Sequence, residues 1–396
     1  MNLFFARLTG KIKSADKFEK QLQDIKNITL RYREVEQSSE MKEYLELKEK
    51  VDNPRFAEKK REYKNKKYKD TVEYKNHSEY LKLQKDKTVK RYLTAANDEE
   101  RDKIKGAIVV KNYMQLCAIV EAPDFEERRA FWADSKRWEK TEESRLEARY
   151  NELAASDDIR FFLNAPKKDI EAYELMHKTF GADFSDASLE KNGLKTGFWF
   201  KAPALKRDFS YVDEDLAYLG ENNINIQDGV LSVVTQKGEV EAPAWAGEKK
   251  GFVMHTFPYS SANIHTGDTF EQEEGIFEVK VRASGKCHSA VYLVGEDRFP
   301  IIEIFHFDGK HINIGYTDKN TRKEEVLRGI KANDWQCFGV LVNRYEIAWQ
   351  LNGTEIYRTK NPLPGQKLHF TAQSFAKKGK GAEGKLDIAW IKAFEK

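Results

Sequence analysis

The apolar run from Pro300 to Asp308 contains two side chains whose chemistry does not fit a purely apolar strand. Glu303 and His306 interrupt it, and it closes at Asp308-Gly309. Its length and composition predict a buried strand that ends in a turn. A carboxylate in such a strand has to be paired, hydrogen-bonded or protonated, because burying it alone is costly. The run therefore predicts either a polar network or the lining of a cleft.

Metal and cofactor chemistry find little support in the sequence. Imidazole and carboxylate groups suit several divalent ions, so His288, Glu303, His306 and His311 form one conceivable set of ligands. No tight ligand spacing joins them, and we expect no metal ion and no cofactor. The three cysteines are scattered, odd in number and without a CxxC pair, which argues against a disulfide framework or a cysteine zinc site.

The composition is that of a water-soluble chain of two or three domains. Among its 396 residues, 68 Lys and Arg balance 65 Asp and Glu, and a net charge of +3 argues against polyanion binding by the whole molecule. No apolar run is long enough to span a bilayer. The first residues lack the basic and long apolar regions of a secretory signal. We expect a cytoplasmic protein as the sequence is written, or an extracellular one if a signal was removed or another export route is used.

The first half of the chain has the composition of long helices and contains an internal repeat. There is no glycine from residue 12 to 105, and Lys, Glu, Tyr and Leu dominate. Two copies of about seventy residues occupy roughly 32–101 and 102–170. The matched positions of the two copies are Tyr44/Tyr113, Leu47/Leu116, Val51/Val120, Pro54/Pro123, Phe56/Phe125, Tyr68/Trp138, Thr71/Thr141, Glu73/Glu143, Tyr80/Tyr150, Leu83/Leu153, Val89/Ile159, Tyr92/Phe162 and Leu93/Leu163.

Capping residues predict where several of these helices begin. Asn53-Pro54 reads as an N-cap followed by proline at the first helical position. Thr71 and Thr141 are expected to cap the next helix of each copy, and Asp157-Asp158 a last short helix. The recurring aromatic residues form one apolar face, so that neighbouring units are expected to stack as a helical array.

Two interpretations compete for this array. Its aromatic residues are either inter-helix core in a spacer or assembly arm, or part of a nucleic-acid surface. The second interpretation rests on the basic, aromatic-rich segment 59–69. The matching segment of the second copy, 128–134, keeps the aromatic residues and loses the excess of positive charge. Packing is what the copies share, so we expect assembly or docking and no nucleic-acid partner.

The second half of the chain reads as an all-β domain. After one more predicted helix, Lys168–Thr179, short alternating runs separated by turn residues predict a sandwich or jelly roll. Asn352-Gly353 predicts a two-residue hairpin turn. The expected strands are 223–226, 230–235, 275–283, 289–294, 301–307, 311–316, 336–343, 346–351 and 385–393.

From about Thr196 onward the chain resembles glycoside hydrolase family 16, the laminarinase and lichenase group. The resemblance implies a concanavalin A-like jelly roll. It rests on several segments in the family's order, each of which looks like a family strand or hairpin: 225–233, 259–266, 275–282, 289–295, 347–353 and 386–394. The strand at 289–295 matches the one that normally carries a substrate-stacking tryptophan, a place held here by Tyr292.

The family's catalytic motif is degenerate in this chain. The motif reads Glu-x-Asp-x-x-Glu, for nucleophile, supporting Asp and general acid/base. Aligned on Pro300, those places fall on Ile301, Glu303 and His306, and no nucleophile remains. A shifted register would use Glu303 as the nucleophile and Asp308 as the acid/base. That register breaks the alignment of Pro300 and puts Asp308 in a turn.

No catalytic residue is therefore expected, and two interpretations of the remaining polar side chains stay open. Glu303 and His306 either pair with each other or with His288 or His311 in a buried network, or they hydrogen-bond sugar hydroxyls beside Tyr292. Trp245 lies in a predicted loop that could line the rim of the cleft. The candidate ligand-binding residues are Tyr292, Glu303, His306, His288 and Trp245.

The sequence thus predicts a multi-domain α plus β protein, with an N-terminal all-α helical repeat array and a C-terminal antiparallel β-sandwich. The expected parts are an N-terminal helical segment, two repeats, a linker and the family 16-like domain, at 1–31, 32–101, 102–170, 171–196 and 197–396. The favoured function is a non-catalytic structural or assembly protein that forms homo-oligomers or docks through its helices. The alternatives are an active retaining β-glycosidase acting on a β-glucan-type polysaccharide and a lectin-like glycan-binding module.

Overall fold

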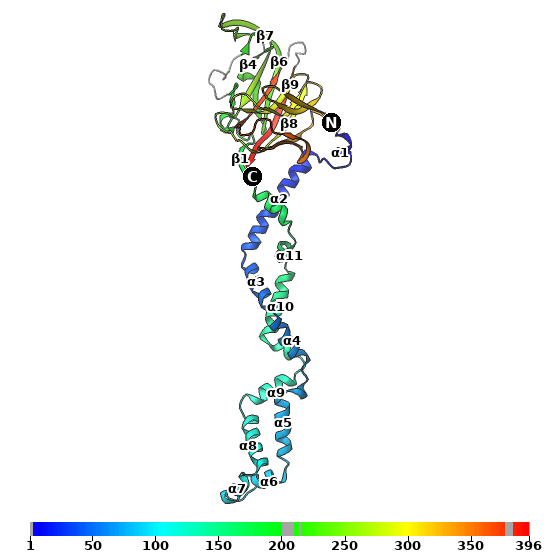
Figure 1. Ribbon diagram of the computed structural model, residues 1–396, viewed down its shortest axis with the longest axis vertical. Helices are drawn as coiled ribbons and strands as arrows, with labels where there is room; N and C mark the ends of the chain where they lie inside the picture. Colours follow the sequence, from blue (N-terminus) through cyan, green and yellow to red (C-terminus); the bar gives the residue numbers. More distant parts are fainter. Residues whose placement is uncertain (1–2, 200–209, 214, 377–382, 396) are drawn as a thin grey trace. The chain divides into compact units, whose positions relative to one another are not determined.

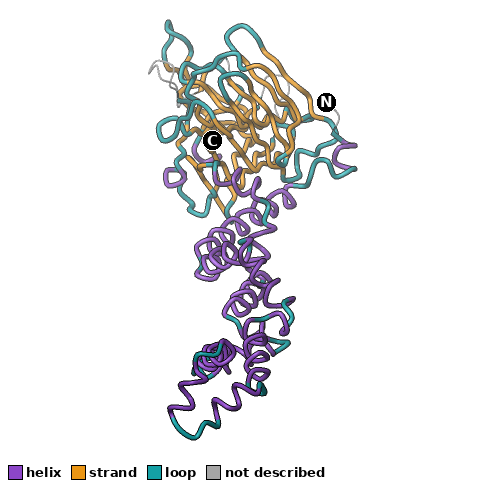
Figure 2. Tube along the Cα trace, turned by 60° about the horizontal axis from the view of Figure 1, so that its bottom comes forward, coloured by secondary structure: helices purple, strands orange, loops and turns teal. Residues whose placement is uncertain are grey.

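The computed structural model of the protein describes residues 3–199, 210–213, 215–376 and 383–395. The chain forms two compact units. The first joins Met1–Thr29 to Lys167–Lys396, and the second is Leu30–Pro166. In Figure 2 the strands all lie in the first unit, whereas the second consists of helices and loops. The predicted fold class, all-α followed by an antiparallel β-sandwich, is confirmed.

The second unit consists of short helices whose starts follow the capping residues. Asn53 accepts a hydrogen bond from the N–H of Arg55, with proline at the first helical position, and Thr71 and Thr141 cap their helices. The predicted cap at Asp157 is wrong by one residue. The N-cap is Ser156, whose hydroxyl accepts a hydrogen bond from the backbone N–H of Ile159. The helices are the end of α2 (Ala15–Gln37), then α3 (Ser39–Val51), α4 (Pro54–Asn65), η1 (Tyr68–Asp70), α5 (Val72–Leu83), α6 (Lys87–Leu93), α7 (Asp98–Lys105), α8 (Ile108–Val120), α9 (Phe125–Ala133), η2 (Arg137–Lys140), α10 (Glu142–Ala155) and α11 (Asp157–Asn164).

Equivalent residues of the two sequence copies meet in reciprocal pairs. Tyr44 of α3 stacks on Tyr150 of α10 with ring centroids 5.4 Å apart, and Tyr80 of α5 stacks on Tyr113 of α8 at 5.5 Å. Tyr44 matches Tyr113 in the repeat and Tyr80 matches Tyr150, so the two stacks are equivalent contacts. Figure 1 shows α5 beside α8. The first helix of each copy therefore packs on the third helix of the other, and the copies run in opposite directions.

Ion pairs between the two copies also lie at equivalent positions. Lys59 pairs with Glu143, and Arg128 lies 3.7 Å from Glu73. Lys59 and Arg128 are 69 positions apart, the same offset as Phe56 and Phe125, while Glu73 and Glu143 are matched by the repeat. Some of the positive charge of segment 59–69 is therefore paired with carboxylates of the other copy.

The first unit is built on two antiparallel sheets joined by long strands. One sheet has the order β5–β6–β17–β8–β13–β14–β15. Strands β6 and β1 pair in turn with the same side of β17, β6 with its first residues and β1 with its last. The other has the order β2–β7–β16–β9–β10–β11–β12. The strands are β1 (His177–Ala182), β2 (Lys195–Thr196), β3 (Ser210–Tyr211), β4 (Ala217–Leu219), β5 (Ile224–Gln227), β6 (Val230–Trp245), β7 (Phe252–His265), β8 (Gly275–Gly285), β9 (His288–Gly295), β10 (Ile301–Phe307), β11 (Ile312–Thr317), β12 (Arg322–Leu327), β13 (Gln336–Val342), β14 (Glu346–Leu351), β15 (Thr354–Lys360), β16 (Leu368–Phe375) and β17 (Gly384–Glu395).

The core lies between these sheets, and Trp349 is its largest fully buried side chain. Outside the two sheets, β6 and β7 continue as a long hairpin that β3 and β4 join in parallel. The short helices of this unit are α1 (Phe4–Leu8), α12 (Lys167–Glu174), η3 (Glu190–Asn192) and η5 (Glu221–Asn223). The predicted hairpin turn is present, with φ of +49° at Asn352 and +75° at Gly353.

Two segments that the sequence set apart from the β domain belong to its packing. The start of α2 lies on the sheet that contains β17, where Phe18 packs near Trp390 and Glu19 pairs with Lys280 at 2.6 Å. Within the expected linker, 171–196, strand β1 pairs with β17, so the predicted helix 168–179 ends early, at Glu174. Among the described residues, no helix is long and apolar enough to cross a membrane.

Candidate functional site

A β-bulge in β10 brings Ile301, Glu303 and His306 to one face of the sheet. Residues three apart point to opposite faces of a regular strand. In β10 the register shifts between Glu303 and Phe305 against β9, and between Glu303 and His306 against β11. The extra residue returns His306 to the face of Glu303. At this irregularity the indole N–H of Trp349 donates to the Glu303 carbonyl oxygen across the core at 2.8 Å.

Cross-strand register fixes which residues surround Glu303. Its direct partners are Tyr292 on β9 and Gly315 on β11, and Gly315 in turn faces Glu324 on β12. Directly opposed residues share a face, so these four form one row across the sheet. Gly315 adds no side chain to the row, and a Cβ there would lie 2.0 Å from the Lys323 carbonyl oxygen. The glycine therefore permits the close approach of the β11 and β12 backbones.

The polar side chains on this face form a connected cluster. His306 Nδ1 lies 3.4 Å from Glu303 Oε1, and His306 Nε2 lies 3.1 Å from His288 Nδ1. The Arg322 guanidinium lies 3.3 Å from Glu303 Oε1 and 3.3 Å from Glu324 Oε2. Glu303 is only 9% exposed, whereas the Arg322 side chain is 51% exposed. We call Glu303, His306, His288, Arg322 and Glu324 the β10–β12 cluster.

The charge balance of the cluster keeps Glu303 ionised. Burial works to raise the pKa of Glu303, but the contact with His306 and the charge of Arg322 outweigh it, so the pKa lies below its ordinary value. A carboxyl group with a lowered pKa is a poor proton donor at neutral pH. Glu303 is therefore suited to accept hydrogen bonds or bind cations.

Asp308, the acid/base of the shifted register, has a structural role in the turn after β10. Its Oδ1 accepts hydrogen bonds from the backbone N–H groups of Lys310 and His311, at 2.8 and 2.7 Å. Partial burial works to raise its pKa, but these two N–H groups, together with Asn313 and His311, hold it below its ordinary value. His311 stays beside Asp308, at 3.7 Å, instead of joining Glu303.

Of the two predicted aromatic residues, one lies near the cluster and one lies elsewhere in the fold. Tyr292 sits next to Glu303 in the row across the sheet. Trp245 is a strand residue at the end of β6, where its ring packs edge-on against Phe252 of β7 with centroids 5.2 Å apart. It is part of the long hairpin, not of the loop that the sequence predicted.

The structure adds a buried histidine that the sequence analysis missed. His369 on β16 is fully buried, and it lies in the row of Val294 and Ile301. Burial, with His265 nearby, lowers its pKa to about 3. Its ring lies 5.2 Å from that of Trp199. The alternation His-x-Thr-x-Gln in 369–373 was the available signal, since it places polar residues on one face of a strand.

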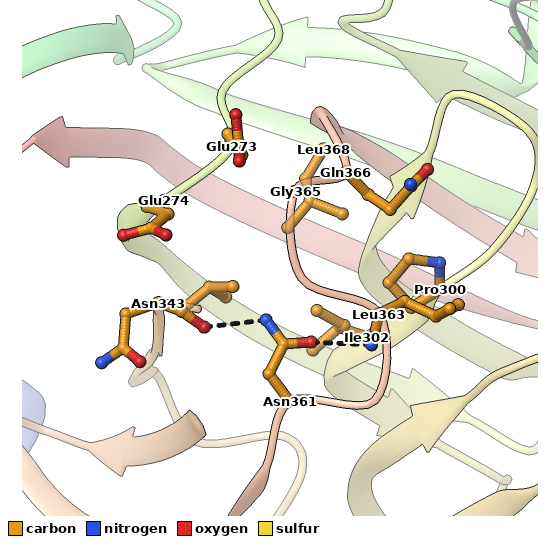
Figure 3. A pocket seen from close by; sticks show the side chains of 11 residues that line it. Glu273, Glu274, Pro300, Ile302, Asn343, Asn361, Leu363, Gly365, Gln366 and Leu368 are labelled. Carbon is orange, nitrogen blue, oxygen red and sulfur yellow. Dashed lines mark hydrogen bonds between the residues drawn. The ribbon is translucent and has the colours of Figure 1, made fainter. Parts of the chain in front are cut away.

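Among the described residues of this unit, two hollows stand out, and the β10–β12 cluster lines neither of them. Figure 3 shows the first, at the start of β10, where the Asn361 side chain donates to the Asn343 carbonyl oxygen and accepts from the Leu363 N–H. It leaves no space for a water molecule. The second, of about 440 Å³, is lined by residues of segment 187–196 and by Glu221, Ile224 and Ile226.

Comparison with known proteins gives structural similarity without sequence similarity. No family model and no curated protein matches the chain. Similar solved structures include the laminarinase catalytic domain of Thermotoga maritima, with 13% identity, 56% of this chain and 98% of that chain covered, and a TM-score of 0.45. The endo-β-1,3-glucanase of Pyrococcus furiosus matches with 15% identity, 56% and 94% coverage and a TM-score of 0.46. SCLam, described as a non-specific endo-β-1,3(4)-glucanase from family GH16, matches with 14% identity, 56% and 92% coverage and a TM-score of 0.45. Similarity at this level assigns no activity or substrate to this chain.

Proposed function

We propose that the β unit is a non-hydrolytic module and that the helical unit serves assembly or docking. The observation that carries the first part is the face shared by Ile301, Glu303 and His306. The side chain of Ile301, which occupies the place of a catalytic nucleophile in the family 16 motif, has no atom able to attack an anomeric carbon. The polar residues beside it belong to the β10–β12 cluster, in which Arg322 bridges Glu303 and Glu324.

Retaining hydrolysis would need two carboxyl groups about 5–5.5 Å apart, one of them able to donate a proton. Glu324 does bring a second carboxylate to within 4.8 Å of Glu303. Arg322 contacts both carboxylates, however, and together with His306 it keeps the pKa of Glu303 below its ordinary value. That arrangement is a salt-bridged pair of carboxylates, in which Glu303 is a poor proton donor. In the shifted register the proton donor would be Asp308. Its carboxylate accepts hydrogen bonds from two backbone N–H groups and its pKa is lowered, which makes it a poor proton donor.

The test of the non-hydrolytic proposal is reducing-sugar release by the full chain. Laminarin, lichenan, agarose and carrageenan provide a panel of polysaccharides, with Glu303→Gln as the paired variant. We expect no release by either protein. Release that Glu303→Gln abolishes would overturn the proposal. His311→Gln, outside the β10–β12 cluster, is the matched control and distinguishes loss of a catalyst from a general effect of substitution.

Exposed apolar side chains on the helical unit support the assembly proposal. Ile108 is 79% exposed and Val72 65% exposed. Apolar surface of this kind favours protein contacts when it forms a patch. The proposed partner is a second copy of the chain, and light scattering measures its mass in solution. We expect an oligomer that weakens in Ile108→Ser. A strict monomer over a wide concentration range would contradict the proposal.

Glycan binding without hydrolysis is a second candidate, supported by the position of Tyr292. Tyrosine beside a buried glutamate offers an aromatic face for a sugar ring and an acceptor for its hydroxyl groups. Binding of the full chain to a glycan array tests it. Signals that Tyr292→Ala removes and Trp245→Ala leaves intact would support this function, because Trp245 lies in the β6–β7 hairpin. An array without signals would contradict it.

A further inference from the structure

The β10–β12 cluster contains a set of donors with the spacing of a metal site. Glu303, His306 and Glu324 each offer one ligand atom, and these atoms lie within 4.8 Å of one another. Zinc binds imidazole nitrogen and carboxylate oxygen at about 2.0–2.2 Å, so two ligands of a tetrahedral ion are separated by roughly 3.3–3.6 Å. His306 Nδ1 and Glu303 Oε1 are 3.4 Å apart. Glu324, at the exposed side of the cluster, has the freedom to close the remaining distance.

Two buried atoms of this set have no hydrogen-bond partner among the described residues. They are Glu303 Oε2 and His306 Nδ1. The contact of His306 Nδ1 with Glu303 Oε1 has the distance of a neighbour but not the direction of a hydrogen bond. A buried polar atom left unpaired costs about 1–3 kcal/mol, and a bound ion is one of its ordinary explanations. This observation is independent of the count of donors.

The neighbouring histidine prepares His306 for such a role. His306 Nε2 lies 3.1 Å from His288 Nδ1. In the tautomer that donates Nε2–H to His288, Nδ1 carries a lone pair and faces the glutamates. Histidines that bind metals commonly donate their second ring N–H to an outer partner, which fixes the orientation of the ring.

We propose that Glu303, His306 and Glu324 bind a divalent first-row transition-metal ion of the zinc class, and that Arg322 competes with it for the two carboxylates. Imidazole with carboxylates, and no thiolate, suits ions of this class. The guanidinium now bridges the carboxylates from the solvent side, and its side chain is 51% exposed. Arg322 is therefore free to move into solvent when an ion enters. The proposal is independent of whether the module acts on or binds a glycan.

The experiment is titration calorimetry of the untagged full chain with Zn²⁺ after chelator treatment, with no glycan present. We expect one site whose affinity falls at least about tenfold in His306→Gln and in Glu324→Gln, since even an outer partner of a metal ligand is worth that much. His311→Gln is the matched control and should bind like the parent chain. Arg322→Gln should bind more tightly, because its competing charge is gone.

Two results would overturn the proposal. The first is an isotherm that is the same in the parent chain, His306→Gln and Glu324→Gln, or no binding in any of them. The second is an Arg322→Gln chain that binds no more tightly than the parent. Glu324 lies on the exposed side of β12, so Glu324→Gln is expected to keep the fold, which circular dichroism without metal verifies. Co²⁺ absorption gives a second readout, a visible band that Glu324→Gln should remove.

Discussion

The fully buried ring of His369 predicts an acid-sensitive β unit. Burial holds its pKa at about 3, against 6.5 for the ordinary side chain. Between these values the unfolded chain binds a proton that the folded chain does not, so folding stability falls as the pH falls below 6.5. At about 1.36 kcal/mol per pKa unit, the loss reaches roughly 5 kcal/mol below pH 3. The same relation gives about 2 kcal/mol between pH 7.5 and pH 5.

The perturbation that isolates this effect is His369→Leu, which removes the titrating ring and keeps an apolar side chain. Neither ring nitrogen has a hydrogen-bond partner among the described residues, so the substitution breaks no such bond. Urea unfolding of the β-sheet signal at pH 7.5 and pH 5 measures the difference for both chains. We expect the parent chain to lose about 2 kcal/mol more than the variant over this range.

Titratable neighbours of His369 also affect its pKa. His265 on β7 works to lower the pKa of His369, and Asp268 in the following turn works to raise it. The matched control is His311→Leu, which makes the same replacement at a histidine whose side chain is 39% exposed. Equal losses of stability in His369→Leu and the parent chain between the two pH values would contradict a lowered pKa of His369 in the folded chain.

Other parts of the fold lead to three further predictions. Trp349→Phe removes the donor of the hydrogen bond to the Glu303 carbonyl oxygen and should lower the free energy of unfolding by about 1–3 kcal/mol. Urea denaturation measures this loss, and an unchanged unfolding midpoint would contradict a stabilising role of the bond. A double-mutant cycle of Tyr44→Leu and Tyr150→Leu should give a coupling free energy of about 0.5–1.5 kcal/mol. The same cycle on the equivalent stack, Tyr80 of α5 on Tyr113 of α8, should give a similar value. Coupling in only one of the two stacks would contradict their equivalence. Gly353→Ala should destabilise the β unit by about 1–3 kcal/mol, because φ is +75° at this position and alanine adopts such a φ only with strain. Thermal unfolding measures the loss, and an unchanged stability would show that the turn adapts.

The sequence predicted single elements well and their partners poorly. The bounds of β10 and β14 were predicted as observed, because apolar runs and turn residues delimit them. Strand β12 was missed, since Arg322-Lys-Glu-Glu-Val-Leu327 is rich in charge and reads as a loop. Arg322 and Glu324 were therefore absent from the predicted site. Register across strands is set by the whole sheet, and no local pattern reveals it.

The same limit holds in the helical unit and at the edges of the β unit. The repeat identified equivalent residues such as Tyr44 and Tyr113 but not that the copies run in opposite directions. Direction depends on long-range contacts that the repeat does not encode. The start of α2 and strand β1 were set apart from the β domain because they precede it in sequence, although Glu19 and residues 177–182 contact its strands.

We propose that the face containing Ile301, Glu303 and Glu324 has no working nucleophile. The most direct test is the intact mass of the full chain after incubation with activated fluoro-glycosides, which trap the covalent intermediate of a retaining glycosidase. We expect an unchanged mass. A mass increase of one glycosyl unit, mapped to Glu303, Glu324 or Asp308, would contradict it.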